Sequence, residues 1–206
     1  MKQNYKIYIN NSIVVLAQDQ QVFHIPKKMK KTSIIYCDNK EVIKNTIDDI
    51  QQEAITHNII LLSNDLKWLK DTFFSFFKVI QAGGGLTYNK EKEVLMIFRK
   101  GKWDLPKGKI EKNEKIKKGA VREVEEETGV KVEKVKKKLG KTFHTYKLKE
   151  KWILKETHWY KMKVFNTENL VPQTEEDIEK VEWIAKKEVK KKLQNSYRSI
   201  ADVFDF

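Results

Sequence analysis

The sequence predicts an α/β protein built from two parts in its 206 residues. Between residues 33 and 77, apolar strand-like segments alternate with amphipathic helical segments, which is typical of a small α/β unit with a parallel central pair. Further along, one long helical segment at 114–128 lies among segments with strand periodicity. A hydrophobic content of 40% is ordinary for a packed core. We therefore expect a small α/β N-terminal domain at 1–77 and a second α/β domain at 78–206.

The N-terminal part begins with two apolar segments, 6–9 and 12–17, around Asn10-Asn11, a pattern that predicts a hairpin. The other elements expected here are a strand at 33–37, a helix at 39–54, a strand at 58–63 and a helix at 65–77. We recognise no family and no catalytic signature in this part. Three roles are open for this part. It could set the oligomeric state, for example as a homodimer, gate a site, or bind a partner.

The second part opens with a strand at 78–88 that contains Gly83-Gly84-Gly85. Glycines in a strand allow close approach of another backbone or a ligand, or mark a β-bulge, and both readings stay open. The later elements expected are strands at 93–99, 131–149, 152–165 and 181–184 and a helix at 186–204.

The central helix at 114–128 has clear end signals. Asn113 is a suitable N-cap, and Gly129 stands where a helix C-cap belongs. No proline interrupts the segment between them. These signals predict a helix of about four turns.

Acidic residues share the face of this helix that ought to be buried. Its apolar stripe consists of Ile116, Ala120 and Val124. Glu123 and Glu127 fall on the same face, Glu126 lies on its edge, and Glu125 is expected to point to solvent. Unpaired charges there would cost several kcal/mol each, and a hard divalent cation with oxygen ligands would relieve that cost. Arg122 precedes Glu126 by four residues and can orient its carboxylate.

The segment resembles the Nudix box, G-x5-E-x7-R-E-U-x-E-E-x-G-U, in which U is aliphatic. All of its specified positions match: Gly108, Glu114, Arg122, Glu123, Val124, Glu126, Glu127, Gly129 and Val130. With average residue usage, such a match at one start has a probability on the order of 10⁻⁸.

The resemblance implies an α/β/α sandwich with a mixed sheet at 78–206, and a Mg²⁺-dependent hydrolase for which Mn²⁺ can substitute. Such enzymes cleave the diphosphate linkage of a nucleoside diphosphate joined to another group. On this hypothesis, one to three metal ions bridge the diphosphate and activate a water, and a glutamate takes the proton.

The resemblance also implies a role for individual residues. The expected metal ligands are Glu123, Glu126, Glu127 and the backbone carbonyl of Lys107. The expected catalytic group comprises Glu126, Glu127, Arg122 and Lys109, with Lys109 near the reacting phosphates. The residues with a structural role in the box are Gly108, Glu114, which braces the loop against the helix, and Gly129.

Candidates outside the box are fewer. The lead-in Trp103-Asp104-Leu105-Pro106-Lys107-Gly108 resembles that of Nudix enzymes acting on diadenosine polyphosphates and diphosphoinositol polyphosphates. The substrate-binding candidates are Lys141, His144, Tyr146 and Arg99. Glu175 or Glu176 is the candidate for a further metal ligand or general base.

The formal net charge of +13 favours a polyanionic partner, although the lysines are spread along the chain. We expect a nucleotide or other polyphosphate substrate, such as a dinucleoside or inositol polyphosphate. The alternatives are an RNA 5′-end pyrophosphohydrolase and a non-catalytic Nudix module that binds nucleotides or RNA; nucleic acid is not the favoured partner. The chain shows no signal peptide and no apolar run near 18 residues, so we expect a cytoplasmic protein without a membrane partner.

Overall fold

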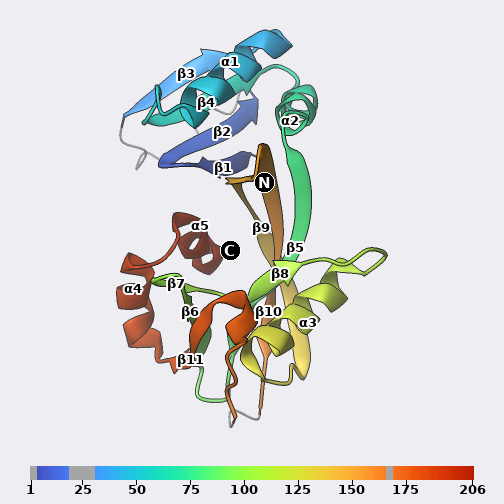
Figure 1. Cartoon of the computed structure of the whole chain (residues 1–206), viewed down its shortest axis with the longest axis vertical. Coiled ribbons are helices and arrows are strands. Elements are labelled where there is room, and N and C mark those ends of the chain that lie inside the picture. The colour runs from blue at the N-terminus through green and yellow to red at the C-terminus, as the bar shows by residue number, and fades with distance from the viewer. Residues whose placement is uncertain (1–3, 19–30, 166–168) are drawn as a thin grey trace. The chain divides into compact units, whose positions relative to one another are not determined.

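The computed structural model describes residues 4–18, 31–165 and 169–206 (Figure 1). The chain divides into two compact units. The first comprises Met1–Ile80 with Phe143–Lys155, and the second comprises Gln81–Thr142 with Glu156–Phe206. This division differs from the boundary predicted after residue 77, because the tip of a long hairpin belongs to the first unit.

The first unit contains a mixed sheet. Its own strands are β1 (Tyr5–Ile9), β2 (Ser12–Gln18), β3 (Thr32–Tyr36) and β4 (Asn58–Ser63). Strands β1 and β2 form the predicted antiparallel hairpin, with Ile9 opposite Ser12 and Asn10 at a φ of 49° in the turn. Strand β4 pairs in parallel with both β2 and β3, so the central pair is parallel, as predicted.

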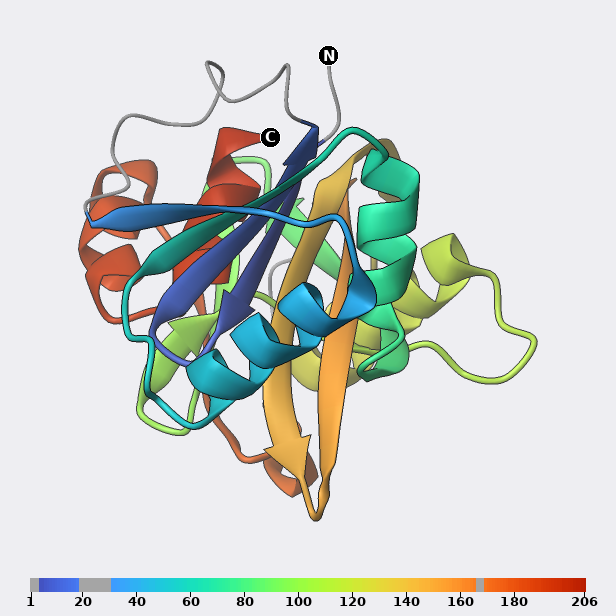
Figure 2. The ribbon, with the colours of Figure 1, turned by 90° about the horizontal axis from the view of Figure 1, so that it is seen from above.

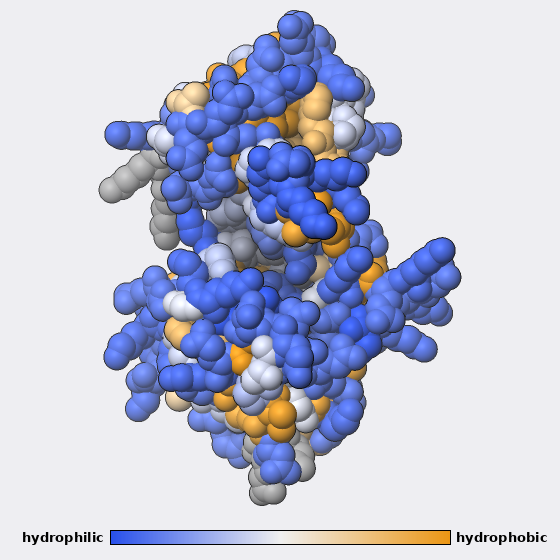
Figure 3. Space-filling view, in the orientation of Figure 1, coloured by the Kyte–Doolittle hydropathy of each residue, from blue (hydrophilic) through white to orange (hydrophobic). Residues whose placement is uncertain are grey.

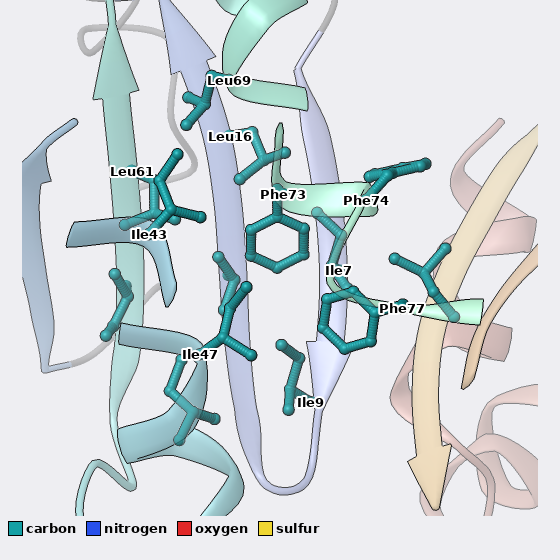
Figure 4. Close-up of a cluster of buried hydrophobic side chains, with 14 of the residues drawn as sticks. Ile7, Ile9, Leu16, Ile43, Ile47, Leu61, Leu69, Phe73, Phe74 and Phe77 are labelled. Atoms are coloured by element: carbon teal, nitrogen blue, oxygen red, sulfur yellow. The ribbon is translucent and has the colours of Figure 1, made fainter. Parts of the chain in front are cut away.

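Two helices cover one face of this sheet (Figure 2). They are α1 (Lys40–Gln51) and α2 (Leu66–Phe74), and both end earlier than the sequence predicted. Asn39 caps α1 and Asp65 caps α2 by accepting hydrogen bonds from backbone N–H groups in the first turns. Figure 4 shows isoleucine, leucine and phenylalanine side chains from the helices and strands meeting in one core.

The second unit is built on a longer set of strands. They are β5 (Lys78–Tyr88), β6 (Val94–Arg99), β7 (Lys102–Asp104), β8 (Lys107–Lys109), β9 (Lys134–Leu148), β10 (Lys151–Lys163) and β11 (Ile178–Ile184). The order across the sheet is β11-β6-β5-β10-β9, with β7 paired to β6 and β8 paired to β5. The hairpin of β9 and β10 contributes Phe143–Lys155 at its tip to the first unit.

Helices cover both faces of the second sheet. Helix α3 (Ile116–Thr128) buries Ala120 and Val124 in one cluster, together with Leu95 and Met162 of the strands. Helix α4 (Lys186–Gln194) packs into a separate cluster on the other face, around the fully buried Trp159. The second unit is therefore an α/β/α sandwich, as the sequence predicted.

The triple glycine of β5 allows close approach of helix α3. A Cβ atom at Gly83 would lie 2.8–2.9 Å from the Cβ, Cα and N atoms of Ala120, closer than real Cβ contacts allow. Strand β5 runs continuously through Gly83, Gly84 and Gly85. Of the two readings of these glycines, the structure therefore supports close backbone approach.

The prediction of one C-terminal helix at 186–204 is wrong. The segment folds as α4, then α5 (Arg198–Ala201) and a short 3-10 turn at Asp202–Asp205. Between the helices, the carbonyl of Asn195 accepts a hydrogen bond from the N–H of Trp103, and the Ser196 hydroxyl donates to the Trp103 carbonyl. These long-range bonds replace helical ones. The segment 186–204 contains no glycine or proline that would have predicted the interruption between α4 and α5.

Hydrophilic residues cover most of the face drawn in Figure 3. Among the residues that the structure describes, no helix combines the length and apolar character needed to cross a membrane.

Leu69 is fully buried in the core of the first unit, whereas Leu148 of the same unit is 54% exposed. We expect Leu69→Ala to lower the free energy of unfolding by about 2–5 kcal/mol, because it leaves a cavity in a packed core. Leu148→Ala makes the same chemical change at the surface and should cost less than about 0.5 kcal/mol. Urea unfolding followed by tryptophan fluorescence measures both. Equal losses for the two variants would contradict the burial assigned to Leu69.

Candidate functional site

The start of helix α3 differs from the prediction. The helix begins at Ile116 rather than near Glu114, and its N-cap position is Lys115, which forms no side-chain capping bond. Asn113, the predicted N-cap, is in a turn with a φ of 67°, and the N–H of Glu114 donates to the carbonyl of Glu111 at 3.1 Å. The Glu114 carboxylate instead binds Arg122, which lies within the helix.

Arg122 connects the acidic residues of the box. Its Nε and Nη2 atoms donate to the two carboxylate oxygens of Glu114, each at 2.9 Å. Its Nη1 atom donates to Glu123 Oε1 and Glu126 Oε2, both at 2.7 Å. Nη2 also donates to the Lys109 carbonyl at 3.1 Å, which ties the preceding loop to the helix. The guanidinium lowers the pKa of Glu114 to about 2, chiefly through these hydrogen bonds.

Gly108 provides room for the carboxylate of Glu123. A Cβ atom at position 108 would lie only 1.7 Å from Glu123 Oε2. Any side chain there would push the carboxylate away from β8. At the other end of the helix, Gly129 has a φ of 76° and its N–H donates to the Glu125 carbonyl, which is the predicted C-cap.

Glu125 does not simply point to solvent, contrary to the prediction. Its carboxylate accepts hydrogen bonds from the N–H of Val132 at 2.9 Å and from Lys131 Nζ at 3.0 Å. Glu125 thus holds the chain that follows the helix.

Glu127 is the buried acid of the site. It is 1% exposed, and its Oε2 accepts a hydrogen bond from the backbone N–H of Lys107 at 2.8 Å. Burial raises the pKa of Glu127 to about 7, although the positive charges of Lys107 and Arg99 act in the opposite direction. A carboxyl group with this pKa is half protonated near neutral pH in the metal-free protein.

Arg99 lies between two acidic residues. Its Nη1 atom is 3.6 Å from Glu127 Oε1, and its Nη2 atom is 3.7 Å from Glu176 Oε2. Both loop acids named from the sequence are exposed, and of the two it is Glu176 that shares an arginine with the box. The substrate-binding role expected for Arg99 stays a prediction, and these contacts give it an internal role in holding acids.

Asp104 was expected only as part of the lead-in to the box, without a role of its own. It is 2% exposed, its Oδ1 accepts from the N–H of Leu105, and its Oδ2 lies 2.5 Å from Lys107 Nζ. This buried ion pair fixes the strand that carries Lys107 next to Glu127. One pattern in the sequence could have indicated its buried ion pair: Asp104 stands between apolar residues and precedes Lys107 by three positions.

The other substrate-binding candidates are found in different surroundings. Lys141 Nζ lies 2.5 Å from Glu156 Oε1, and His158 Nε2 is 3.0 Å from the same oxygen. These two partners lower the pKa of Glu156 to about 2. His144 and Tyr146 belong to the first unit, where their ring centroids are 5.9 Å apart. Substrate contact by Lys141, His144 and Tyr146 stays a prediction.

The donor set suits a hard divalent cation. Glu123, Glu126 and Glu127 offer carboxylate oxygens on one helix, and the Gly108 cradle leaves space beside β8 where a side chain would intrude. In the part of the chain that the structure describes, no three acidic, histidine or cysteine side chains converge on one point. Arg122 instead binds one carboxylate oxygen of Glu123 and one of Glu126.

An open depression of about 620 Å³ borders this cluster along the outer side of α3. Arg122 and Glu126 line it together with Lys117, Lys118 and Lys131. Cationic side chains therefore stand next to the most exposed acid of the box, whose side chain is 48% accessible.

The raised pKa of Glu127 is directly measurable. In protein stripped of metal with EDTA, we expect one glutamate carboxyl signal to titrate near pH 7 in carbon-detected NMR, because burial disfavours its charge. Glu127→Gln should remove that signal, while Glu126→Gln, which alters an exposed neighbour, should leave it in place. A carboxyl at position 127 that titrates at an ordinary value would contradict the buried geometry.

A family model and several known proteins are similar to this chain. Residues 81–204 match the family model described as the NUDIX domain. Nudix hydrolase 8 from Arabidopsis thaliana is 49% identical over 57 residues, which represent 24% of this chain and 15% of that protein. This chain therefore spans only a small share of the length of that curated relative.

The solved structures that are similar to this chain are more distant in sequence. A MutT protein from Methanosarcina mazei Go1 is 23% identical, with a TM-score of 0.48 over 63% of this chain and 92% of that one. An Ap4A hydrolase from C. elegans, solved as a binary complex, is 18% identical, with a TM-score of 0.47 over 61% of this chain and 93% of that one. Since the NUDIX domain match spans more than half of the residues and includes the complete box on β8 and α3, this chain belongs to the Nudix family.

Proposed function

We propose that this protein is a Nudix pyrophosphohydrolase, a hydrolase that cleaves a phosphoric anhydride within a diphosphate linkage. One observation carries the proposal: the box acids are all present on or just before α3, and Arg122 binds three of them, Glu114, Glu123 and Glu126. A Nudix module that only bound its ligand would not need all of these acids.

The residues that would hold a divalent cation are Glu123, Glu126, Glu127 and the carbonyl of Lys107. Mg²⁺ or Mn²⁺, when bound, supplies positive charge to a diphosphate and makes a water more acidic. Arg122 gathers Glu123 and Glu126 at 2.7 Å and so keeps their charges close together before a ligand arrives.

The three glutamates differ in access. Side-chain exposure is 48% for Glu126, 13% for Glu123 and 2% for Glu127. Glu126 is thus the acid that a substrate and a proton from bulk water reach most directly. The Glu127 carboxylate is covered by Arg99 and by the backbone of Lys107. Its hydrogen bond to the Lys107 N–H links the helix to β8.

The substrate that we propose is heavily charged, either a nucleoside diphosphate derivative or a dinucleoside or inositol polyphosphate. Lys117, Lys118 and Lys131 surround the depression beside Glu126, and Lys109 is exposed on β8. Several cations around one acidic centre suit a ligand with phosphates beyond the scissile pair.

The first test is hydrolysis of a panel of nucleotides, dinucleoside polyphosphates, inositol pyrophosphates and RNA with a 5′-triphosphate. We expect Mg²⁺-dependent turnover that EDTA abolishes and that Glu126→Gln lowers by about three orders of magnitude or more, since losing a charged catalytic group costs that much. The matched control is Glu133→Gln, an exposed glutamate that accepts a hydrogen bond from the Phe165 N–H and does not line the depression. It should stay within a few-fold of the wild type.

Four outcomes would each contradict a part of this proposal. Turnover that persists in EDTA would remove the metal from the reaction. Near-wild-type activity of Glu126→Gln would remove that residue from it. Binding of panel members without any turnover would favour the non-catalytic module, and turnover confined to RNA would favour the 5′-end pyrophosphohydrolase.

The lysines beside α3 give a second prediction. Neutralising Lys117 and Lys118 together should raise KM by about tenfold for the most highly charged substrates, with a smaller effect on kcat, because these cations bind phosphates outside the reacting centre. Neutralising Lys137 and Lys138, which are exposed on β9 and do not line the depression, makes the same change in net charge. Steady-state kinetics of the two double glutamine variants would refute the assignment if both showed the same rise in KM.

A further inference from the structure

The second unit contains another concave surface, on the face of the sheet that carries α4. We call it the α4 groove, and its volume is about 710 Å³. Its apolar floor includes Tyr88, Val94, Leu193 and Phe204, which pack in the same cluster as α4. Lysines from several elements surround this floor. An apolar floor within a cationic rim suits an amphipathic anion.

Segments far apart in the sequence contribute the rim. Lys90 and Lys92 come from the turn between β5 and β6, Lys136 from β9, and Lys161 and Lys163 from β10. Such a gathering of cations is unfavourable unless counterions or a ligand balance it.

Helix α4 completes the rim with Lys186 and Lys190, one turn apart on the side facing the groove. On the same helix, Lys187 and Lys191 are also exposed but do not line the groove. The helix thus offers two equivalent lysine pairs in different surroundings.

The protein does not neutralise this rim itself. Within residues 4–18, 31–165 and 169–206, none of the rim lysines forms an ion pair with a carboxylate. The adjacent acid Glu93 is engaged by Asn89, whose Nδ2 donates to its carboxylate at 2.8 Å. Lys161 instead lies over the Tyr88 ring, with Nζ 5.0 Å from the ring centroid. The positive charge is therefore available to an external anion.

The size of the groove favours a small ligand. Its volume lies within the range of roughly 300–1,000 Å³ that is common for small-molecule sites. The apolar floor suits a planar or hydrophobic body, and the lysines suit phosphates attached to it. Inorganic polyphosphate would use the rim but leave the floor uncovered.

We propose that the α4 groove is a second ligand site, which binds a phosphorylated ligand of the nucleotide class, independently of the box. The two sites lie on different faces of the sheet, because α3 and α4 pack into separate core clusters. Occupancy of the α4 groove therefore needs neither the box glutamates nor a divalent cation.

The test measures binding of a fluorescent ATP analogue with an N-methylanthraniloyl group, by anisotropy, in EDTA. We expect the double variant Lys186→Glu/Lys190→Glu to weaken binding by about tenfold or more, since it places two negative charges at the rim. Lys187→Glu/Lys191→Glu is the matched control, with the same helix, spacing and change in net charge, and should stay within about twofold. Unlabelled ATP should compete better than inorganic tripolyphosphate, because only ATP covers the floor.

The proposal fails if the two double variants lose affinity equally, which would indicate attraction by net charge alone. It also fails if Lys186→Glu/Lys190→Glu binds like the wild type, which would leave the box as the only nucleotide site. Competition by tripolyphosphate as strong as by ATP, or displacement by a glutamate-rich peptide but not by ATP, would overturn the ligand class. All of these results are independent of turnover, so they are distinguishable from failure of the proposed hydrolase activity.

Discussion

The close packing of helix α3 against strands β5 and β8 is the constraint on which the site depends. Gly83 lets the backbone of the helix approach β5, and Gly108 lets the carboxylate of Glu123 lie against β8. A methyl group at either position would have to displace a neighbouring element or carboxylate. Because the helix is so close, the backbone N–H of Lys107 reaches Glu127 at 2.8 Å. The acids are thus placed by packing before any ligand contributes.

Within this frame, carboxylates on helix α3 and just before it have opposite properties. Glu114, outside the helix start, accepts two hydrogen bonds from Arg122, and its pKa falls to about 2. Glu127, on the buried face, loses water, and its pKa rises to about 7. Glu126 remains accessible at the edge. A divalent cation would favour the charged form of every ligand and would remove much of this contrast.

The positive charge of the protein is organised rather than evenly spread. Lysines beside the box flank the depression along α3, and a second group surrounds the α4 groove on the other face of the sheet. Many of the remaining lysines are solvated on the surface, which suits a protein with a net charge of +13. Lys107 differs from these surface lysines, because it is buried and paired with Asp104. The structural environment of each lysine, rather than its presence in the sequence, therefore indicates what that lysine can bind.

By itself the sequence determined the α/β class, most of the strands, the helix of the box, its C-cap at Gly129 and the acids that it presents. These features follow from local rules of periodicity, capping and spacing, which act within a few residues. The tertiary structure decided what depends on distant partners: the break at Asn195, which pairs with Trp103, and the burial of Asp104 and Glu127. It also gathered the α4 groove from segments as distant in the sequence as Tyr88 and Phe204. Periodicity carries no information on such contacts, since they arise only when the sheet brings remote strands and helices together.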